Sequence, residues 1–305
     1  MAVRLARFAV CFHHSNSKAI YIQPAYKISG NAYRTEVIDD AFKDHNTNFG
    51  FQKVSEHEKA DKVHHVFSNV AEKYDLMNDA MSWGIHRLWK DRLISVLGPL
   101  PGMQLIDVAG GTGDISVRFV QAIKNLQLKR ERDYDIDGEH TARPTSAHVV
   151  DINREMLLAG KRNRGQLYPE LSWTHGDAEC LPYSDNSFDA YTIGFGIRNV
   201  THIDRVLSEA RRVLRPGGRF LCLEFSHVGN PLLRSLYDSY SFQVIPVMGM
   251  LLARDWNSYK YLVESIRKFP KQDLFSEMIA EAGFRNVTYE NLMGGIAAIH
   301  SGFKM

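Results

Sequence analysis

The sequence predicts an α/β fold, in which a mostly parallel sheet carries helices on both faces. Three observations indicate it. Short apolar runs alternate with helix-length segments from residue 104 onward. A glycine-rich turn follows the first run, at the place where parallel sheets bind ligands. The 305 residues are 44% hydrophobic and 24% charged, which is typical of a folded chain with a substantial core.

The expected elements begin with a helix. Apolar residues recur at helical spacing over 85–97, and Gly98 with Pro99 ends the pattern. The apolar runs that follow are expected as strands at 104–108, 147–151, 171–175, 188–195 and 219–224.

Two more helices and two more strands complete the predicted sheet. An apolar stripe over 203–214 is expected to form one helix, with Thr201 and Asp204 placed as a capping box at its start. A second helix is expected between Pro270 and Gly283. The last strands are expected at 286–290 and 296–303.

The charge of the chain is unevenly distributed. The formal net charge is +2, but residues 1–35 contain five Lys or Arg and no Asp or Glu, so the remaining 270 residues carry −3. This acid-free, Arg-bearing start predicts an organellar transit peptide, and a disordered basic tail is the alternative. The polar stretch 36–60 is expected to be a flexible linker before a domain at 61–305.

Composition also excludes several function classes. A net charge near zero gives no reason to expect nucleic-acid binding. Three cysteines without a CxxC pair predict neither a disulfide framework nor a metal site. The longest apolar run, 244–253, is interrupted by Pro246 and Gly249 and is shorter than the ~20 residues that a spanning helix needs.

The turn Gly-Gly-Thr-Gly at 110–113 joins the first strand to a helix. A dinucleotide fingerprint would have glycine or alanine at Ser116, and Asp114 puts negative charge where a pyrophosphate would lie. S-adenosylmethionine has no phosphate and carries a positive sulfonium, so the turn suits it better. A strand-to-helix turn without a ligand is the alternative.

The next two strands end in acids. Asp151 is placed to accept both ribose hydroxyls of an adenosine, and Asp177 follows the third strand, where it could accept from the adenine amino group. Each acid alone is more often a helix cap or a loop residue. Together with the turn, they predict an adenosine site at the carboxyl edge of the sheet.

Four segments match motifs that occur together in one known family. They are 74–82, 195–199, 212–220 and 294–302. On these segments the chain resembles the ubiquinone/menaquinone biosynthesis C-methyltransferases. The resemblance covers about residues 62–305, and Arg215 stands where the family has lysine.

This resemblance implies a class I S-adenosylmethionine-dependent methyltransferase, with seven strands of which the last is antiparallel, that methylates a ring carbon of a polyprenyl benzoquinol. Bacterial relatives have a cofactor-binding serine where this chain has Gly194. The expected cofactor-binding residues are Gly110, Gly111, Thr112, Gly113, Asp151, Asp177 and Ala178.

The expected catalytic residues are Arg198, Asn199 and Tyr74. Arg198 follows the fourth strand and could stabilise a phenolate, with Asn199 orienting the oxygen. In the alternative, Arg198 pairs with a structural carboxylate. Arginine stays charged, so a base must come from elsewhere, and Tyr74, His86 and Glu224 are candidates, although His86 is equally well placed for a structural role.

Two insertions and several partners complete the expectations. Residues 124–143 are expected as an exposed charged insertion, and 230–266 as an apolar helical insertion that packs on the core, forms a dimer or holds a polyprenyl tail. The resemblance implies a peripheral enzyme on the matrix side of the mitochondrial inner membrane, in a homodimer and a complex with other ubiquinone-synthesis enzymes. An NAD-dependent oxidoreductase and a cofactor-binding scaffold subunit are the alternative functions.

Overall fold

The structure is a computed structural model that describes residues 46–70, 79, 82–134, 143–240 and 256–305. The expected transit peptide and Tyr74 lie outside these residues.

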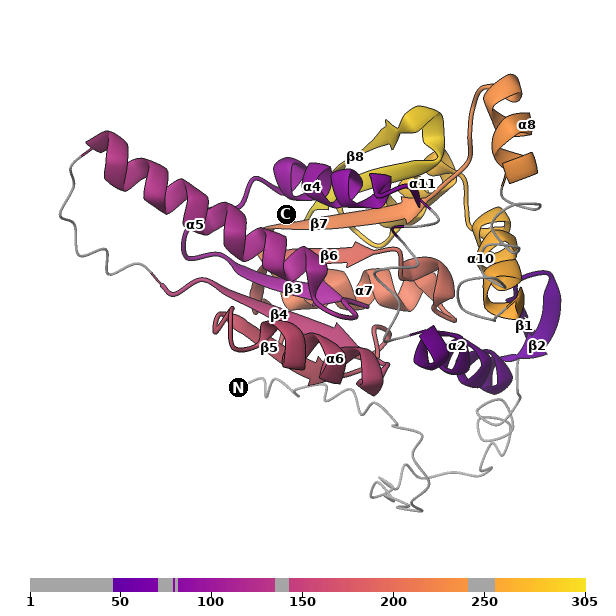
Figure 1. Ribbon diagram of the computed structural model, residues 1–305, viewed down its shortest axis with the longest axis horizontal. Coiled ribbons are helices and arrows are strands. Elements are labelled where there is room, and N and C mark those ends of the chain that lie inside the picture. The colour runs from indigo at the N-terminus through magenta and orange to yellow at the C-terminus, as the bar shows by residue number, and fades with distance from the viewer. Residues whose placement is uncertain (1–45, 71–78, 80–81, 135–142, 241–255) are drawn as a thin grey trace, which may run out of the picture. The chain divides into compact units, whose positions relative to one another are not determined.

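Seven strands form one sheet in the order β5-β4-β3-β6-β7-β9-β8 (Figure 1). Strands β3 to β7 pair in parallel, and β9 is antiparallel to both of its neighbours. The predicted sheet with an antiparallel last strand is confirmed. The strands are β3 (Gln104–Val108), β4 (Ser146–Asp151), β5 (Leu171–His175), β6 (Phe188–Gly194), β7 (Leu214–Phe225), β8 (Arg285–Leu292) and β9 (Ala297–Phe303).

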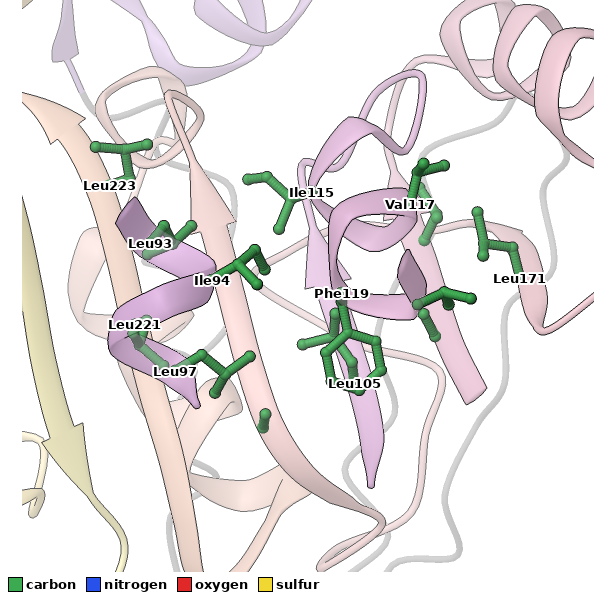
Figure 2. Packing of buried hydrophobic residues seen from close by; sticks show 14 of the residues in the cluster. Leu93, Ile94, Leu97, Leu105, Ile115, Val117, Phe119, Leu171, Leu221 and Leu223 are labelled. Atoms are coloured by element: carbon green, nitrogen blue, oxygen red, sulfur yellow. The ribbon is translucent and has the colours of Figure 1, made fainter. Parts of the chain in front are cut away.

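Helices cover both faces of the sheet. Buried residues of α4, α5 and α6 pack on one face, where Leu93, Phe119 and Leu105 share a cluster (Figure 2). Buried residues of α7 and α11 pack on the other face. The helices are α2 (Glu56–Val70), α4 (Ile85–Leu97), α5 (Asp114–Tyr134), α6 (Arg154–Arg164), α7 (Ile203–Val213), α8 (Pro231–Ser239), α10 (Trp256–Lys268) and α11 (Gln272–Glu281), with 3-10 turns η2 (Ile197–Asn199) and η4 (Met293–Gly295).

The expectation of a flexible linker is wrong for residues 46–60. Strands β1 (Asn46–Phe49) and β2 (Gln52–Ser55) form a hairpin, and α2 follows directly. The same structural unit runs from His45 to Met305, so the folded part begins before residue 61. The hairpin is too short and polar for a sequence pattern, and distant contacts order it: the Phe49 ring stacks on Tyr261 with centroids 4.1 Å apart.

The predicted capping box of α7 is also wrong. His202 occupies the cap position, and no side chain of the cap accepts a hydrogen bond. Glu179, from the loop after β5, binds the backbone that leads into the helix: its Oε1 accepts from Thr201 N at 2.9 Å and from His202 N at 2.8 Å. A carboxylate more than twenty residues away thus holds the cap residue and the residue before it, rather than the N–H groups of the first helical turn.

Both insertions contain helices. Helix α5 continues to Tyr134, and residues 125–130 are exposed, as expected for that part of 124–143. The 230–266 insertion contains α8, which is largely exposed, and α10, which buries Tyr259, Tyr261, Val263 and Ile266. Within the described ranges, no helix has the length and apolar character required to cross a membrane.

Candidate functional site

A pocket lies at the carboxyl edge of the sheet, where β3, β4, β5 and β6 end. Strand β3 lies between β4 and β6. The chain builds the sheet outward from β3 through β4 to β5 and then crosses to β6 on the other side of β3. Open α/β sheets bind ligands at the carboxyl edge where the strand order reverses in this way. Helices contribute Val63 and His64 of α2, Lys90 of α4, Asp114 and Ile115 of α5 and Met156 of α6. Most other lining residues follow the four strands, at 109–112, 151–153, 176–179, 194–196 and 199–201.

The glycine turn forms the centre of the pocket. Gly110, Gly111 and Thr112 line it. Gly113 has a positive φ of 77°, and a Cβ there would lie 2.6 Å from the Trp173 ring. Gly113 therefore serves to turn the chain beneath Trp173, and it is not among the residues that line the pocket.

Asp151 is fixed by the turn that it faces. Its Oδ2 accepts from Gly111 N at 2.8 Å, and its Oδ1 accepts from Asn153 N at 2.7 Å. Burial raises the pKa of this carboxyl, and these backbone hydrogen bonds oppose the rise. Each oxygen keeps a lone pair after these bonds, so the carboxylate could accept from the two hydroxyls of a ribose.

Asp177 and Ala178 line the pocket beside Asp151, as the sequence predicts. Asp177 Oδ1 accepts from Glu179 N at 2.9 Å, which leaves Oδ2 for a ligand. Two carboxylates next to a glycine turn fit the sugar and the base of an adenosine. The described residues therefore fit S-adenosylmethionine, and they contain no group of His, Cys, Asp and Glu suited to a metal ion.

The surroundings of Asp114 overturn one expectation. Lys90 Nζ lies 2.9 Å from its Oδ2, Arg118 Nε lies 3.4 Å from its Oδ1, and Arg164 Nη2 lies at 4.0 Å. Burial raises the pKa of Asp114, but the three cations outweigh burial and lower it to about 2. Asp114 therefore carries its negative charge, as expected, but the three cations around it compensate that charge, so Asp114 does not count against an anionic ligand.

Ser116 still favours S-adenosylmethionine over a dinucleotide. Ser116 is buried, and its Oγ donates to Asp107 Oδ2 at 3.0 Å, so a side chain fills the place of the third glycine. Sequence reasoning missed Lys90 as a pocket residue and Arg164 as a partner of Thr112, whose Oγ1 lies 2.7 Å from Arg164 Nη1. Arg164 lies 52 residues from Thr112, and no motif connects them.

The expected catalytic residue Arg198 binds Glu224, one of the candidate bases. Arg198 Nη1 lies 2.8 Å from Glu224 Oε1 and donates to Phe195 O at 2.6 Å. Only 5% of the Arg198 side chain and 1% of the Glu224 side chain are exposed. Burial raises the pKa of Glu224, and Arg198 opposes the rise. Arg198 thus has the carboxylate partner that the alternative reading expects, and it does not belong to the pocket lining.

Asn199 and His86, the remaining candidates that the structure describes, differ in their surroundings. Asn199 lines the pocket, and its Oδ1 accepts from Tyr261 OH at 3.0 Å. His86 is buried, and its Nδ1 lies 2.8 Å from Ser82 Oγ. Burial, together with Lys90, lowers the pKa of His86 to about 4, so the ring is neutral at pH 7. A structural role for His86 is favoured.

Comparison with known proteins identifies the family. The profile of the ubiE/COQ5 methyltransferase family matches residues 52–304. The chain belongs to this family. The chain is 55% identical to the mitochondrial 2-methoxy-6-polyprenyl-1,4-benzoquinol methylase of Danio rerio, over 87% of this chain and 86% of that relative. Identity is 59% to the Bos taurus enzyme and 55% to the Homo sapiens enzyme of the same name, over 85% of this chain and 84% of each relative.

A solved structure shares the fold. A SAM-dependent methyltransferase from Thermotoga maritima superposes with a TM-score of 0.52 and 17% identity, over 79% of this chain and 99% of that one. As a member of the ubiE/COQ5 family, the chain is a methyltransferase whose methyl donor is S-adenosylmethionine. Neither the oxidoreductase nor the scaffold alternative is supported.

Replacement of Asp151 tests the cofactor site. Asp151→Ala removes the buried carboxylate that fits the ribose, and we expect the Kd for S-adenosylmethionine to rise by about 10- to 100-fold, as measured by isothermal titration calorimetry. Glu290→Ala, which removes an exposed carboxylate paired with Arg92, serves as the control and should leave the Kd unchanged. An Asp151→Ala variant with wild-type affinity would remove Asp151 from the site.

Asp107 predicts a pH dependence of stability. Its oxygens accept from Thr192 Oγ1 at 2.8 Å and from Ser116 Oγ at 3.0 Å, and burial raises its pKa from 3.8 to about 6. The folded state binds the Asp107 proton more tightly than the unfolded state does. The protonated carboxyl therefore adds to the free energy of unfolding in full below pH 3.8, and this addition is lost as the pH rises through 6.

Urea unfolding of the wild type and Asp107→Asn between pH 4 and 7 measures this effect. The free energy of unfolding of the wild type, relative to the variant, should rise by about 2–3 kcal/mol as the pH falls across that range. A difference between the two proteins that does not change with pH contradicts the expectation.

Proposed function

We propose that the protein transfers a methyl group from S-adenosylmethionine to a ring carbon of 2-methoxy-6-polyprenyl-1,4-benzoquinol in ubiquinone biosynthesis. The observation that carries the proposal is the 55–59% identity to vertebrate enzymes of that name, over most of both chains. The pocket supports it, because the glycine turn, Asp151 and Asp177 provide the contacts that an adenosine-containing donor needs.

The chemistry sets what the chain must do. Bound S-adenosylmethionine supplies an electrophilic methyl group on a sulfonium. A quinol ring becomes a strong carbon nucleophile when one hydroxyl loses its proton, and the ring carbon that gains the methyl group must then release its own proton. The chain has to align the two molecules, stabilise the phenolate and accept the protons.

Asn199 and Arg198 are proposed to act on the phenolate oxygen. Asn199 lines the same pocket as the glycine turn and can donate an amide N–H to the oxygen. Arg198 is paired with Glu224 and does not itself line the pocket, so it is proposed to act on the oxygen from behind Asn199, through its positive charge and through its buried Nε, which has no hydrogen-bond partner among the described residues. Tyr74, which lies outside those residues, remains a proposed catalytic residue.

The location and partners of the protein form part of the proposal. The printed names of the relatives include "mitochondrial", and the basic segment 1–35 is suited to import. We propose that the enzyme binds peripherally to the matrix side of the inner membrane, as a homodimer within a complex of ubiquinone-synthesis enzymes. The 230–266 segment supports such contacts, because α8 exposes 73% of Leu232 and α10 exposes 44% of Trp256.

A methyl-transfer assay tests the function. With labelled S-adenosylmethionine and a short-tailed 2-methoxy-1,4-benzoquinol, we expect label in the reduced acceptor and none in the oxidised quinone, because only the quinol ring is nucleophilic. The donor, but not NAD, should raise the melting temperature. Binding of the donor without transfer to the quinol would instead favour the scaffold alternative.

The Arg198–Glu224 pair requires a paired test of its own. Arg198→Ala should abolish most turnover, but it also leaves Glu224 buried and unpaired, which costs about 3–5 kcal/mol of stability. The double variant Arg198→Met with Glu224→Leu removes both charges and should recover the stability of the protein and its affinity for S-adenosylmethionine, while turnover stays at least 100-fold below the wild type. A stable double variant with wild-type turnover would show that Arg198 is only structural.

A further inference from the structure

Tyr261 connects three parts of the chain at the edge of the pocket. It lies on α10, only 5% of it is exposed, and its hydroxyl donates to Asn199 Oδ1 at 3.0 Å. On the hairpin side, the Phe49 ring stacks on it with an interplanar angle of 11°. Sequence patterns give Tyr261 no role beyond the buried stripe of a helix.

The direction of this hydrogen bond decides how the Asn199 amide is oriented. An amide has one oxygen, which accepts, and one nitrogen, which donates twice. Burial raises the pKa of the Tyr261 hydroxyl to about 12, with Glu224 adding to the rise and Arg198 opposing it, so the group remains a donor at physiological pH. A donating hydroxyl binds the amide oxygen and leaves the two N–H donors for the pocket that Asn199 lines.

We propose that Tyr261 is a positioning residue, which holds the Asn199 amide so that its N–H donors face the acceptor and fix a ring oxygen of the quinol. This inference rests on the proposed function, because the ring oxygen is the group that the amide would orient. Tyr261 itself makes no contact with the reacting atoms in this proposal; it acts through Asn199.

The backbone around Asn199 is held by contacts other than the Tyr261 hydroxyl. Loss of that hydroxyl should therefore affect the Asn199 side chain and leave the backbone in place. Asn199 is the last residue of the short turn η2, and Lys59 Nζ donates to the next carbonyl, Val200 O, at 2.7 Å. Arg198 N donates to Glu224 Oε2 at 3.3 Å one residue earlier. The Phe49 ring fixes the plane of the Tyr261 ring, so Tyr261→Phe removes one hydrogen bond and keeps the packing.

Steady-state kinetics with the quinol, together with calorimetry of donor binding, tests the inference. Tyr261→Phe should lower kcat about tenfold and leave the Kd for S-adenosylmethionine within about twofold, because the amide rotates without its anchor. Tyr183→Phe is the matched control: it also removes a partly buried tyrosine hydroxyl, which donates to Thr174 Oγ1 at 2.9 Å, but Tyr183 does not line the pocket. Its kcat should equal that of the wild type.

Two further variants separate positioning from a general loss of stability. Asn199→Asp keeps an oxygen for the Tyr261 hydroxyl but has no N–H donor, so its kcat should fall at least as far as that of Tyr261→Phe. Adding Tyr261→Phe to Asn199→Ala should change kcat by less than about twofold, because the hydroxyl acts only through the amide.

Three results would overturn the inference. They are a wild-type kcat for Tyr261→Phe, a wild-type kcat for Asn199→Asp, and losses that multiply in the double variant. These outcomes differ from failure of the proposed function, in which the wild-type enzyme itself methylates no quinol and the role of Tyr261 falls with it.

Discussion

The hydrogen bond from the Gly111 amide to the Asp151 carboxylate is the contact on which the cofactor site depends. It joins the turn after β3 to the end of β4, so one carboxylate both closes the turn and faces the pocket. Burial raises the pKa of Asp151, and the backbone N–H groups help to keep it charged. The parallel pairing of β3 and β4 places these two strand ends side by side, so the sheet brings the two halves of the site together.

The acceptor side is built differently, from segments that lie far apart in the sequence. The η2 turn is held by Glu224 from β7, by Lys59 from α2 and by Tyr261 from α10, while Glu179 binds the two residues that lead into α7. Burying the Arg198–Glu224 pair takes two charges out of water, and only close geometry compensates for it. Such a turn is suited to hold Asn199 in one place.

The sequence predicted what local patterns determine. The structure agrees residue for residue with the strands predicted at 104–108 and 171–175 and with the helix predicted at 85–97. Each of these segments has its own apolar pattern, and a glycine follows each within two residues. The glycine turn, Asp151 and Asp177 were predictable because each lies at the end of a strand or begins within two residues of it. The β1–β2 hairpin, the cations around Asp114 and the Tyr261 anchor were not, since each depends on a partner that only the folded chain brings near. Arg198 and Glu224 were both singled out, yet no pattern showed that they pair.

The central claim is that this pocket forms a bond between a methyl group and a ring carbon, rather than a ring oxygen. The direct measurement is carbon NMR of the product formed by the wild-type enzyme from S-adenosylmethionine with a ¹³C-labelled methyl group and the reduced quinol. We predict that the labelled carbon has the chemical shift of a methyl group on an aromatic ring carbon and that the ring loses one proton signal. A labelled methoxy signal with every ring proton retained would contradict it.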